Sequence, residues 1–150
     1  MTNNTCWSRF VVKSIGTYSS ENGYVSSADN VFDPNMITDL IGINPEYMCE
    51  YGKNKRRIAK SNAKYMFSGW FGLKVVEPPI DRSAHIKHII ERLKPNKNKL
   101  IAFKEKYHAI YEIETTIYEG GDADIFINSE EISFLKDVGI ELRITTFLMK

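Results

Sequence analysis

Hydrophobic and polar residues alternate along much of this chain with the two-residue period of a half-buried β-strand. A denser run of aromatic and β-branched residues predicts a strand near the middle of a sheet, and two shorter apolar stretches predict brief strands. The strands expected on these grounds are Ser8–Gly16, Glu46–Tyr51, Tyr65–Val76, Tyr107–Tyr118, Ala123–Ile127 and Ile140–Leu148.

The alternation is clearest in the stretch from Ala109 to Tyr118. Glu112 and Glu114 fall on one face of this predicted strand, and Tyr111 and Ile113 fall on the other. We therefore expect the strand to bury one face and to present a wet, partly acidic face to solvent.

Amphipathic helices are predicted where apolar residues recur at three- and four-residue intervals. The first has clear boundaries, because Asp33 can accept hydrogen bonds from free backbone amides, Pro34 suits the first turn, and Gly42 can end the helix with a positive φ. The helices expected are Pro34–Ile41, one that follows a capping Asp81 and stops before Pro95, Lys97–Tyr107, and one capped by Asn128 or Ser129 that runs to Val138.

Two polar stretches interrupt these elements. Residues 17–30 are rich in Ser, Asn, Gly and Asp, which is typical of a long surface loop or a ragged hairpin. Residues 53–64 are predicted to form a basic loop. Gly69 and Gly72, within the central strand, mark points where a bulge or a close approach is expected.

The sequence around the first predicted helix is repeated near the end of the chain. Phe32–Ile43 and Ile127–Ile140 each place an apolar residue, a capping residue and a short amphipathic helix before a Gly-Ile pair. The repeat predicts two related strand–helix–strand halves, and chance similarity between two capped helices is the alternative. The fold class expected is α+β, with helices packed on one face of a mostly antiparallel sheet.

Size and composition are those of a single globular domain spanning residues 1–150, with 43% hydrophobic and 26% charged residues. The first residues lack the pattern of a secretory signal, and no apolar run reaches the about 18 to 20 residues of a membrane span. We therefore expect a cytoplasmic protein without a membrane segment, in which Cys6 and Cys49 are free thiols.

Charge is divided along the chain, although the formal net charge is only +1. Residues 1–52 carry two basic and six acidic residues, residues 53–107 carry fifteen and four, and residues 108–150 carry three and nine. If the three segments stay apart in the fold, the molecule is a strong electrical dipole that can steer a charged partner. If their strands pair with one another, the charges mix and the dipole shrinks.

Two groups of charged residues are candidate binding residues, each with a plainer alternative. Cations in the basic loop stand before aromatic residues and could meet an acidic protein or a nucleic acid, or could form a solvated loop. The paired carboxylates Asp122 and Asp124 could bind a cation or act as acid and base, or could serve as turn residues. The candidates are Lys53, Lys55, Arg56, Arg57, Glu112, Glu114, Asp122 and Asp124.

Motifs for cofactor chemistry are missing from the sequence, so no metal and no cofactor are expected. The chain has neither of the glycine-rich phosphate-binding motifs. His85 and His88 stand three apart on a predicted helix but supply only half of a metal site. A pocket lined by His108, Glu112 and Asp122 would instead indicate an enzyme of unfamiliar type.

Several segments together resemble the bacterial family known only as domain of unknown function 4279. They are SRFVV at Ser8–Val12, FDPNMITDLIGINP at Phe32–Pro45, Gly52 with nearby Arg57, the Trp70 strand, HIKHIIERLKP at His85–Pro95 and ISFLKDVGIELRI at Ile132–Ile144. The polar stretch 17–30 departs from the family pattern. The resemblance implies an α+β sandwich and assigns no catalytic residue.

The leading hypothesis is a non-enzymatic binding module with a protein partner, because no reactive constellation is visible beside the opposed charge blocks. By analogy with other small bacterial proteins, that partner could be a toxin, which would make the chain an immunity protein. The alternatives are a nucleic-acid-binding protein that uses the 53–64 loop and an enzyme of unrecognised type. No membrane partner is expected.

Overall fold

The computed structural model describes residues 6–53, 63–76, 82–118 and 125–147. It contains seven strands, β1 (Trp7–Lys13), β2 (Thr17–Ser19), β3 (Gly23–Val25), β4 (Pro45–Cys49), β5 (Gly69–Val76), β6 (Ile110–Tyr118) and β7 (Ile140–Phe147). Its α-helices are α1 (Asn35–Ile41), α2 (Arg82–Leu93), α3 (Lys97–Tyr107) and α4 (Ser129–Val138), and short 3₁₀ turns cover Ala28–Asn30 and Lys94–Asn96.

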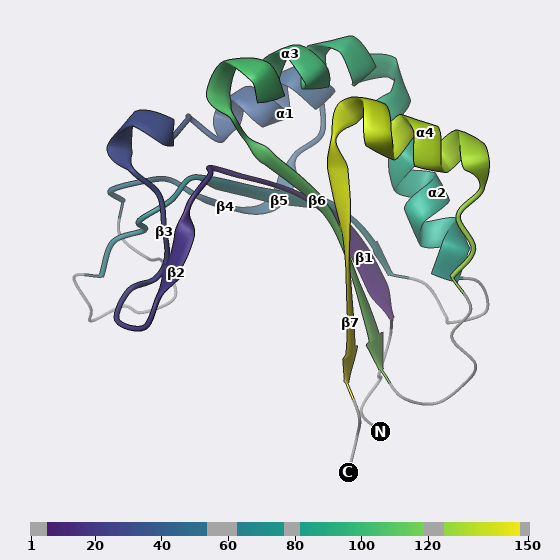
Figure 1. The fold of residues 1–150 in the computed structure, drawn as a ribbon, viewed down its shortest axis with the longest axis horizontal. Helices are drawn as coiled ribbons and strands as arrows, with labels where there is room; N and C mark the ends of the chain where they lie inside the picture. The colour runs from purple at the N-terminus through teal and green to yellow at the C-terminus, as the bar shows by residue number, and fades with distance from the viewer. Residues whose placement is uncertain (1–5, 54–62, 77–81, 119–124, 148–150) are drawn as a thin grey trace.

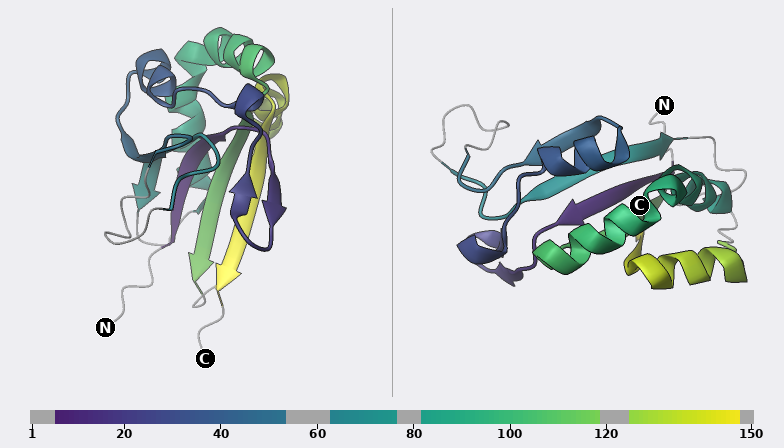
Figure 2. Two further views of the ribbon diagram at one scale, coloured as in Figure 1. Left: turned by 90° about the vertical axis from the view of Figure 1, so that its left-hand side faces the viewer. Right: turned by 90° about the horizontal axis from the view of Figure 1, so that it is seen from above.

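Five of the strands form one sheet in the order β4-β5-β1-β6-β7. All neighbouring pairs are antiparallel except β6 and β7, which run parallel. The four helices lie together on one side of this sheet (Figures 1 and 2). The predicted fold class, α+β with helices on one face of a mostly antiparallel sheet, is confirmed.

The core lies between the helices and the facing side of β5, β1 and β6. Phe10 is fully buried, and its ring meets Trp70 and Tyr111 edge-on, with centroids 6.1 Å and 5.7 Å away. The polar ends of these two neighbours are satisfied, because Trp70 Nε1 donates to Thr38 Oγ1 at 3.0 Å and the Tyr111 hydroxyl donates to the carbonyl of Leu100 at 2.6 Å. Each aromatic side chain is thus fixed in one orientation.

The predicted helix boundaries agree with the caps in the structure. The carboxylate of Asp33 accepts a 2.9 Å hydrogen bond from the amide of Asn35, and Gly42 ends α1 with a φ of 70°. At α4, Asn128 accepts from the amide of Glu131 and Gly139 ends the helix with a φ of 78°. These caps supply partners for backbone groups that the helix itself leaves free. Asp81, the predicted cap of α2, lies outside the described residues.

The two predicted strand–helix–strand halves are alike in their helices but not in the sheet. Helix α4 joins β6 to β7, which are direct neighbours. Helix α1 leads into β4, which lies at the far edge and pairs with β5, a strand that comes later in the chain. The sequence repeat therefore reflects a shared helix-to-strand turn, and it does not extend to equivalent positions in the sheet.

Three local predictions change in the structure. The first strand ends at Lys13 rather than Gly16, and the central strand begins at Gly69 rather than Tyr65. For the polar stretch 17–30, the structure confirms the ragged hairpin among the two predicted alternatives, as β2–β3 followed by a 3₁₀ turn. The strand predicted at Ala123–Ile127 is wrong for its described part, since residues 125–127 lie in no strand.

Gly69 and Gly72 are positions of close approach, as predicted. A Cβ atom at Gly72 would lie 2.6 Å from the Trp70 ring, and one at Gly69 would lie 2.8 Å from the rings of Phe67 and Phe71. The pairing of β5 with β1 shifts register beside Gly72, where Leu73 has a φ of 51°. The glycines therefore leave room for the aromatic rings that flank the sheet.

Candidate functional site

The side of the sheet opposite the helices carries charged and aromatic side chains, and we call it the helix-free face. In β1, β6 and β7 it is formed by alternate residues whose neighbours enter the core, whereas register shifts interrupt the alternation in β4 and β5. Its members are Trp7, Arg9, Val11 and Lys13 of β1, Glu46 and Tyr47 of β4, Phe71 and Lys74 of β5, Glu112 and Glu114 of β6, and Arg143 of β7.

Arg9 occupies the centre of this face. Its guanidinium carbon lies 4.9 Å from the ring centroids of Trp7 and Phe71, and 5.5 Å from that of Tyr47. Its Nε donates to the Glu114 carboxylate at 2.8 Å. A guanidinium can stack on aromatic faces and pair with a carboxylate at the same time, so this side chain of β1 links β1 to β4, β5 and β6.

A second charged cluster lies toward β7. Lys13 Nζ is 3.2 Å from Glu112 Oε1, and Arg143 is 3.4 Å from the same oxygen. The side chains of Lys13 and Glu112 are only 10% and 5% exposed. The other oxygen of Glu112 has no hydrogen-bond partner among the described residues. The wet acidic face predicted for β6 is therefore wrong, because cations from β1 and β7 cover these carboxylates.

The β2–β3 hairpin lies over this cluster. The Tyr24 ring is 4.8 Å from Lys13 Nζ, and its hydroxyl donates to the carbonyl of Ser14 at 2.7 Å. Beneath the hairpin is a small cavity of about 90 Å³, bounded also by Tyr18, Phe67 and Arg143. Arg143 donates a hydrogen bond to Tyr18, and this bond, together with the charge of Glu112, raises the pKa of Arg143. The hairpin closes this end of the face.

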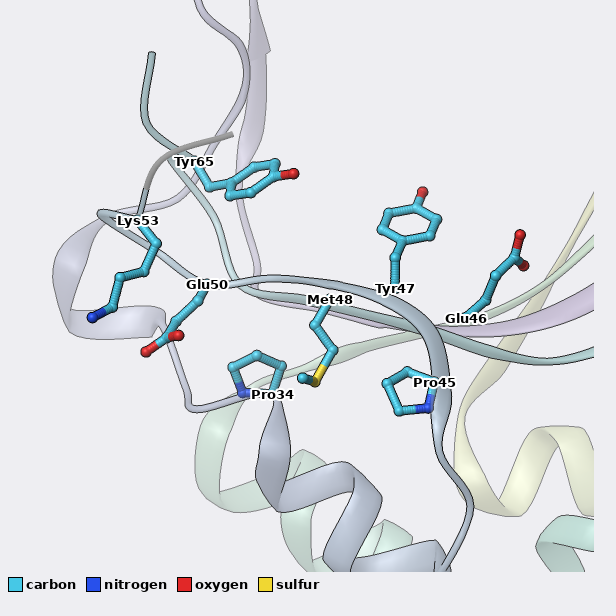
Figure 3. Close-up of a pocket in the computed structure, with 8 residues that line it drawn as sticks. All are labelled: Pro34, Pro45, Glu46, Tyr47, Met48, Glu50, Lys53 and Tyr65. Carbon is cyan, nitrogen blue, oxygen red and sulfur yellow. The ribbon is translucent and has the colours of Figure 1, made fainter. Parts of the chain in front are cut away.

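A larger cavity follows the outer edge of β4, and we call it the β4 groove. It has a volume of about 620 Å³ and is lined by Pro34, Pro45, Glu46, Tyr47, Met48, Glu50, Lys53 and Tyr65. Figure 3 shows Tyr47 and Tyr65 on one side of the strand and Met48 on the other, between the two prolines. Glu46 lies at one end of the groove, and Glu50 and Lys53 lie at the other.

The groove combines apolar walls with charges that remain accessible. Tyr47 stacks on Phe71 with ring centroids 4.3 Å apart and an interplanar angle of 9°, so this wall is rigid. Burial raises the pKa of the Tyr47 phenol, and nearby Arg9 offsets part of that rise. Glu50 and Lys53 are exposed. Such a mixture of fixed apolar surface and accessible charge suits recognition of another molecule.

The candidate residues predicted from the sequence do not form one site. Lys53 lies in the β4 groove, whereas Glu112 and Glu114 lie within the helix-free face and are paired with cations of β1. The remaining candidates, Lys55, Arg56, Arg57, Asp122 and Asp124, lie outside the described residues. Arg9 and Tyr47 were not identified from the sequence, although the alternation of β1 already places Arg9 and Lys13 on one face.

The three charge blocks of the sequence are interleaved in the fold. Arg9 and Lys13 of the first segment pair with acidic residues of the last, and Lys74 of the middle segment pairs with Glu46 at 3.5 Å. On the helix side, Lys97 pairs with Asp137 at 2.9 Å. Among the residues that the structure describes, the charges of the three blocks therefore mix across the strands and helices.

Reactive side chains do not converge in the described part of the chain. His108 lines a cavity of about 500 Å³ between α3 and α4, but Glu112 is not in that lining. His85 is buried beside Ser8, with 3.5 Å between its Nδ1 and the hydroxyl oxygen, and Cys6 and Cys49 are buried free thiols. Among the described residues, no three metal-binding side chains gather at one point.

Fold and surface together define a class of α+β proteins with a five-stranded mixed sheet, helices on one face and a groove at the β4 edge. Residues 24–148 match the family model described as Domain of unknown function (DUF4279), and the chain belongs to that family. No curated protein and no solved structure matched the chain. No helix among the described residues is long and apolar enough to cross a membrane.

Proposed function

We propose that this protein is a non-enzymatic binding module that holds a segment of a partner protein in the β4 groove. The observation that carries the proposal is the groove itself, about 620 Å³ of space with a stacked tyrosine wall and accessible charges of both signs. The partner's side chains would contact Tyr47 and Tyr65 on one side of β4 and Met48 on the other. Its charged groups would meet Glu46 at one end and Lys53 at the other.

The charges elsewhere on the helix-free face already have partners within the protein, which supports the choice of the groove. Arg9 is held by Glu114 and three rings, and Lys13 is held by Glu112. Opening these buried pairs for a ligand would leave a charge desolvated and unpaired. Glu50 and Lys53 can be approached without such a cost because they are exposed.

A protein partner fits this lining better than a nucleic acid does. Two carboxylates, Glu46 and Glu50, border the groove and would repel phosphates. Nucleic-acid binding through residues 53–64 stays a prediction. It would appear as oligonucleotide binding that weakens steeply with salt and falls when Arg56 and Arg57 become alanine.

Within this proposal, the partner class is a bacterial toxin and the site of action is the cytoplasm. An immunity protein acts by covering a toxin, so it needs a rigid recognition surface and no chemistry of its own. Co-expression with the product of a neighbouring toxin gene should restore growth. If the toxin is equally lethal with and without this protein, the chain is not an immunity protein against that toxin. The broader proposal of a protein-binding module would still stand.

The broader proposal is tested by partner binding and charge reversal. The tagged full-length protein is used to isolate its partner from the source cell, and the affinity of the purified pair is measured by titration calorimetry. Glu50→Lys and Lys53→Glu should each weaken binding about tenfold or more. Each variant brings a charge of the same sign against the partner's charged group at the rim of the groove. Glu130→Lys and Lys99→Glu, matched exposed changes on α4 and α3, should leave the affinity within about twofold.

An affinity that stays unchanged in both groove variants would contradict the groove as the site. Failure to isolate any specific partner from the source cell would contradict the protein-binding function itself. Circular dichroism and thermal unfolding of each variant keep a loss of binding distinct from a loss of fold.

A further inference from the structure

The free edge of β7 differs from the opposite edge of the sheet in its backbone. Strand β4 begins with a proline, which has no N–H to offer, and its pairing with β5 shifts register between Pro45 and Tyr47. Strand β7 contains no proline and pairs with β6 in an unbroken register over eight residues. Natural edges are often protected by prolines and bulges. In the described structure, β7 keeps its outer edge without either.

The exposed part of this edge is also partly apolar. From Arg143 to Phe147 every residue of β7 is exposed, and Ile144 and Phe147 each keep 48% of their surface accessible. Ile144 is on the helix side of the sheet and Phe147 is on the helix-free face. Figure 1 shows β6 and β7 extending beyond α4, so this helix covers only the beginning of β7.

We propose that this edge joins a second copy of the chain, with the two β7 strands antiparallel about a twofold axis at Thr145. Among the described residues of β7 the exposed stretch is Arg143–Phe147, and Thr145 is its midpoint. The axis stands perpendicular to the sheet, because only that orientation makes two β7 strands antiparallel neighbours. The product is a continuous sheet across two copies, with the helices of both on the same side.

Side chains of β7 are complementary to themselves in this register. Thr145 faces Thr145 of the second copy, and Ile144 faces Thr146 of the second copy on the helix side. Both are favourable cross-strand pairs. On the helix-free face, Arg143, which pairs with Glu112 and keeps 47% of its side chain exposed, faces Phe147 of the second copy. Phe147 already stacks on Tyr118 with centroids 5.4 Å apart, so the cation meets a fixed aromatic surface.

Registers with the axis at Arg143 or at Leu142 are less suitable for a closed pair. An axis at Arg143 would place two guanidinium groups against each other. An axis at Leu142 would leave Phe147 outside the paired stretch and would bring the second copy close to α4, which precedes the buried Ile140. The twofold axis at Thr145 avoids both difficulties and covers the exposed apolar residues.

The test uses charge at the axis of the full-length chain. The molar mass of the wild-type protein, measured by analytical ultracentrifugation over a range of concentrations, should show a monomer–dimer equilibrium. Thr145→Lys and Thr145→Glu should each weaken dimerisation about tenfold or more, because each places like charges directly opposite one another. An equimolar mixture of the two variants should restore the dimer, since the lysine of one variant then faces the glutamate of the other across the axis.

Thr17→Lys, a change at an exposed threonine of β2, is the matched control and should leave the dimerisation constant unchanged. A wild-type protein that stays monomeric up to its solubility limit would overturn the proposal. A dimer that persists in both Thr145 variants, or a mixture that does not recover it, would overturn the β7 register. Thermal unfolding of each variant separates dissociation from misfolding. The outcome is independent of the β4 groove, whose variants lie at the other edge.

Discussion

The helix-covered face and the helix-free face of the sheet are built from alternate residues of the same strands. On the covered face of β1, Ser8, Phe10 and Val12 are completely buried in a mostly apolar core. On the other face, Arg9 and Lys13 are also largely covered, but by carboxylates and aromatic rings. Burial alone therefore does not separate the two faces.

The difference lies in what each face loses when a side chain is removed. In the apolar core, a smaller side chain leaves a cavity and loses transfer free energy. On the helix-free face, the loss of one charge leaves its partner buried and unpaired, whereas the loss of both charges can be nearly neutral. Stability measurements on variants of the two faces can therefore distinguish them, and the variants below run from the largest expected effect to the smallest.

Trp70→Ala, on the covered face, should destabilise the protein most, by about 3 to 5 kcal/mol. Trp70 is completely buried, packs on Phe10 and donates to Thr38. Guanidinium unfolding followed by circular dichroism measures the change. Trp70→Phe keeps a ring in the space and should cost clearly less; an equal cost for both variants would contradict the cavity explanation.

Lys13→Met, on the helix-free face, should lower the free energy of unfolding by about 3 kcal/mol. Glu112 then stays buried with only the more distant Arg143 as a partner. The double variant Lys13→Met/Glu112→Leu should recover most of this loss, since it removes both charges and keeps similar volumes. Chemical unfolding of the single and double variants gives the coupling free energy. Additive losses would show that the two side chains do not act as a pair.

The pH dependence of stability should report the buried hydroxyl of Tyr111. Burial raises the pKa of Tyr111 above its ordinary value of 10.0. The folded protein therefore keeps this proton to higher pH than the unfolded chain does. The stabilisation is complete below about pH 10 and is lost as the pH rises further, by about 1.4 kcal/mol for each pH unit.

Tyr111→Phe removes this group and should make the loss of stability between about pH 9 and about pH 11 less steep. At neutral pH it should cost about 1 to 2 kcal/mol, because the carbonyl of Leu100 loses its donor. Urea unfolding at a series of pH values measures both effects. Parallel curves for the two proteins would show that Tyr111 ionises as readily in the folded state as in the unfolded state.

Arg9→Lys should destabilise the protein least, by about 1 kcal/mol of unfolding free energy. Lysine keeps the charge near Glu114 but loses the planar group that lies over the rings of Trp7 and Phe71. Thermal unfolding at neutral pH measures the shift. Lys74→Arg, the reverse change at a residue 5.0 Å from the same Trp7 ring, should be nearly neutral.

Much of the fold follows from signals within short segments of the sequence. The capped helices α1 and α4, the alternating strands β1, β6 and β7, and the hairpin in residues 17–30 all occur near their predicted positions. The prediction of strand structure for residues 125–127 was wrong. A short apolar stretch beside turn residues can equally well be an extended loop that packs on the core, and Ile125 and Ile127 do pack there.

The candidate site could be predicted only in part. The sequence identified Lys53, Glu112 and Glu114 as candidates, and the structure places Lys53 in the groove. The environment of Glu112 depends on Lys13, a residue far away in the sequence, which lies on the same face of the neighbouring strand. No local pattern indicates which strands become neighbours, so the expectation of a solvated acidic face was wrong.

The sequence by itself determined the elements of this protein, because helix caps and the spacing of apolar residues act over a few neighbouring positions. It also determined family membership, which the match over residues 24–148 shows. Only the tertiary structure decided that paired charges come from different blocks, that β4 borders a groove and that β7 has no neighbour on its outer edge among the described strands. These features arise from contacts between segments far apart in the chain, and such contacts are fixed by packing of the whole molecule.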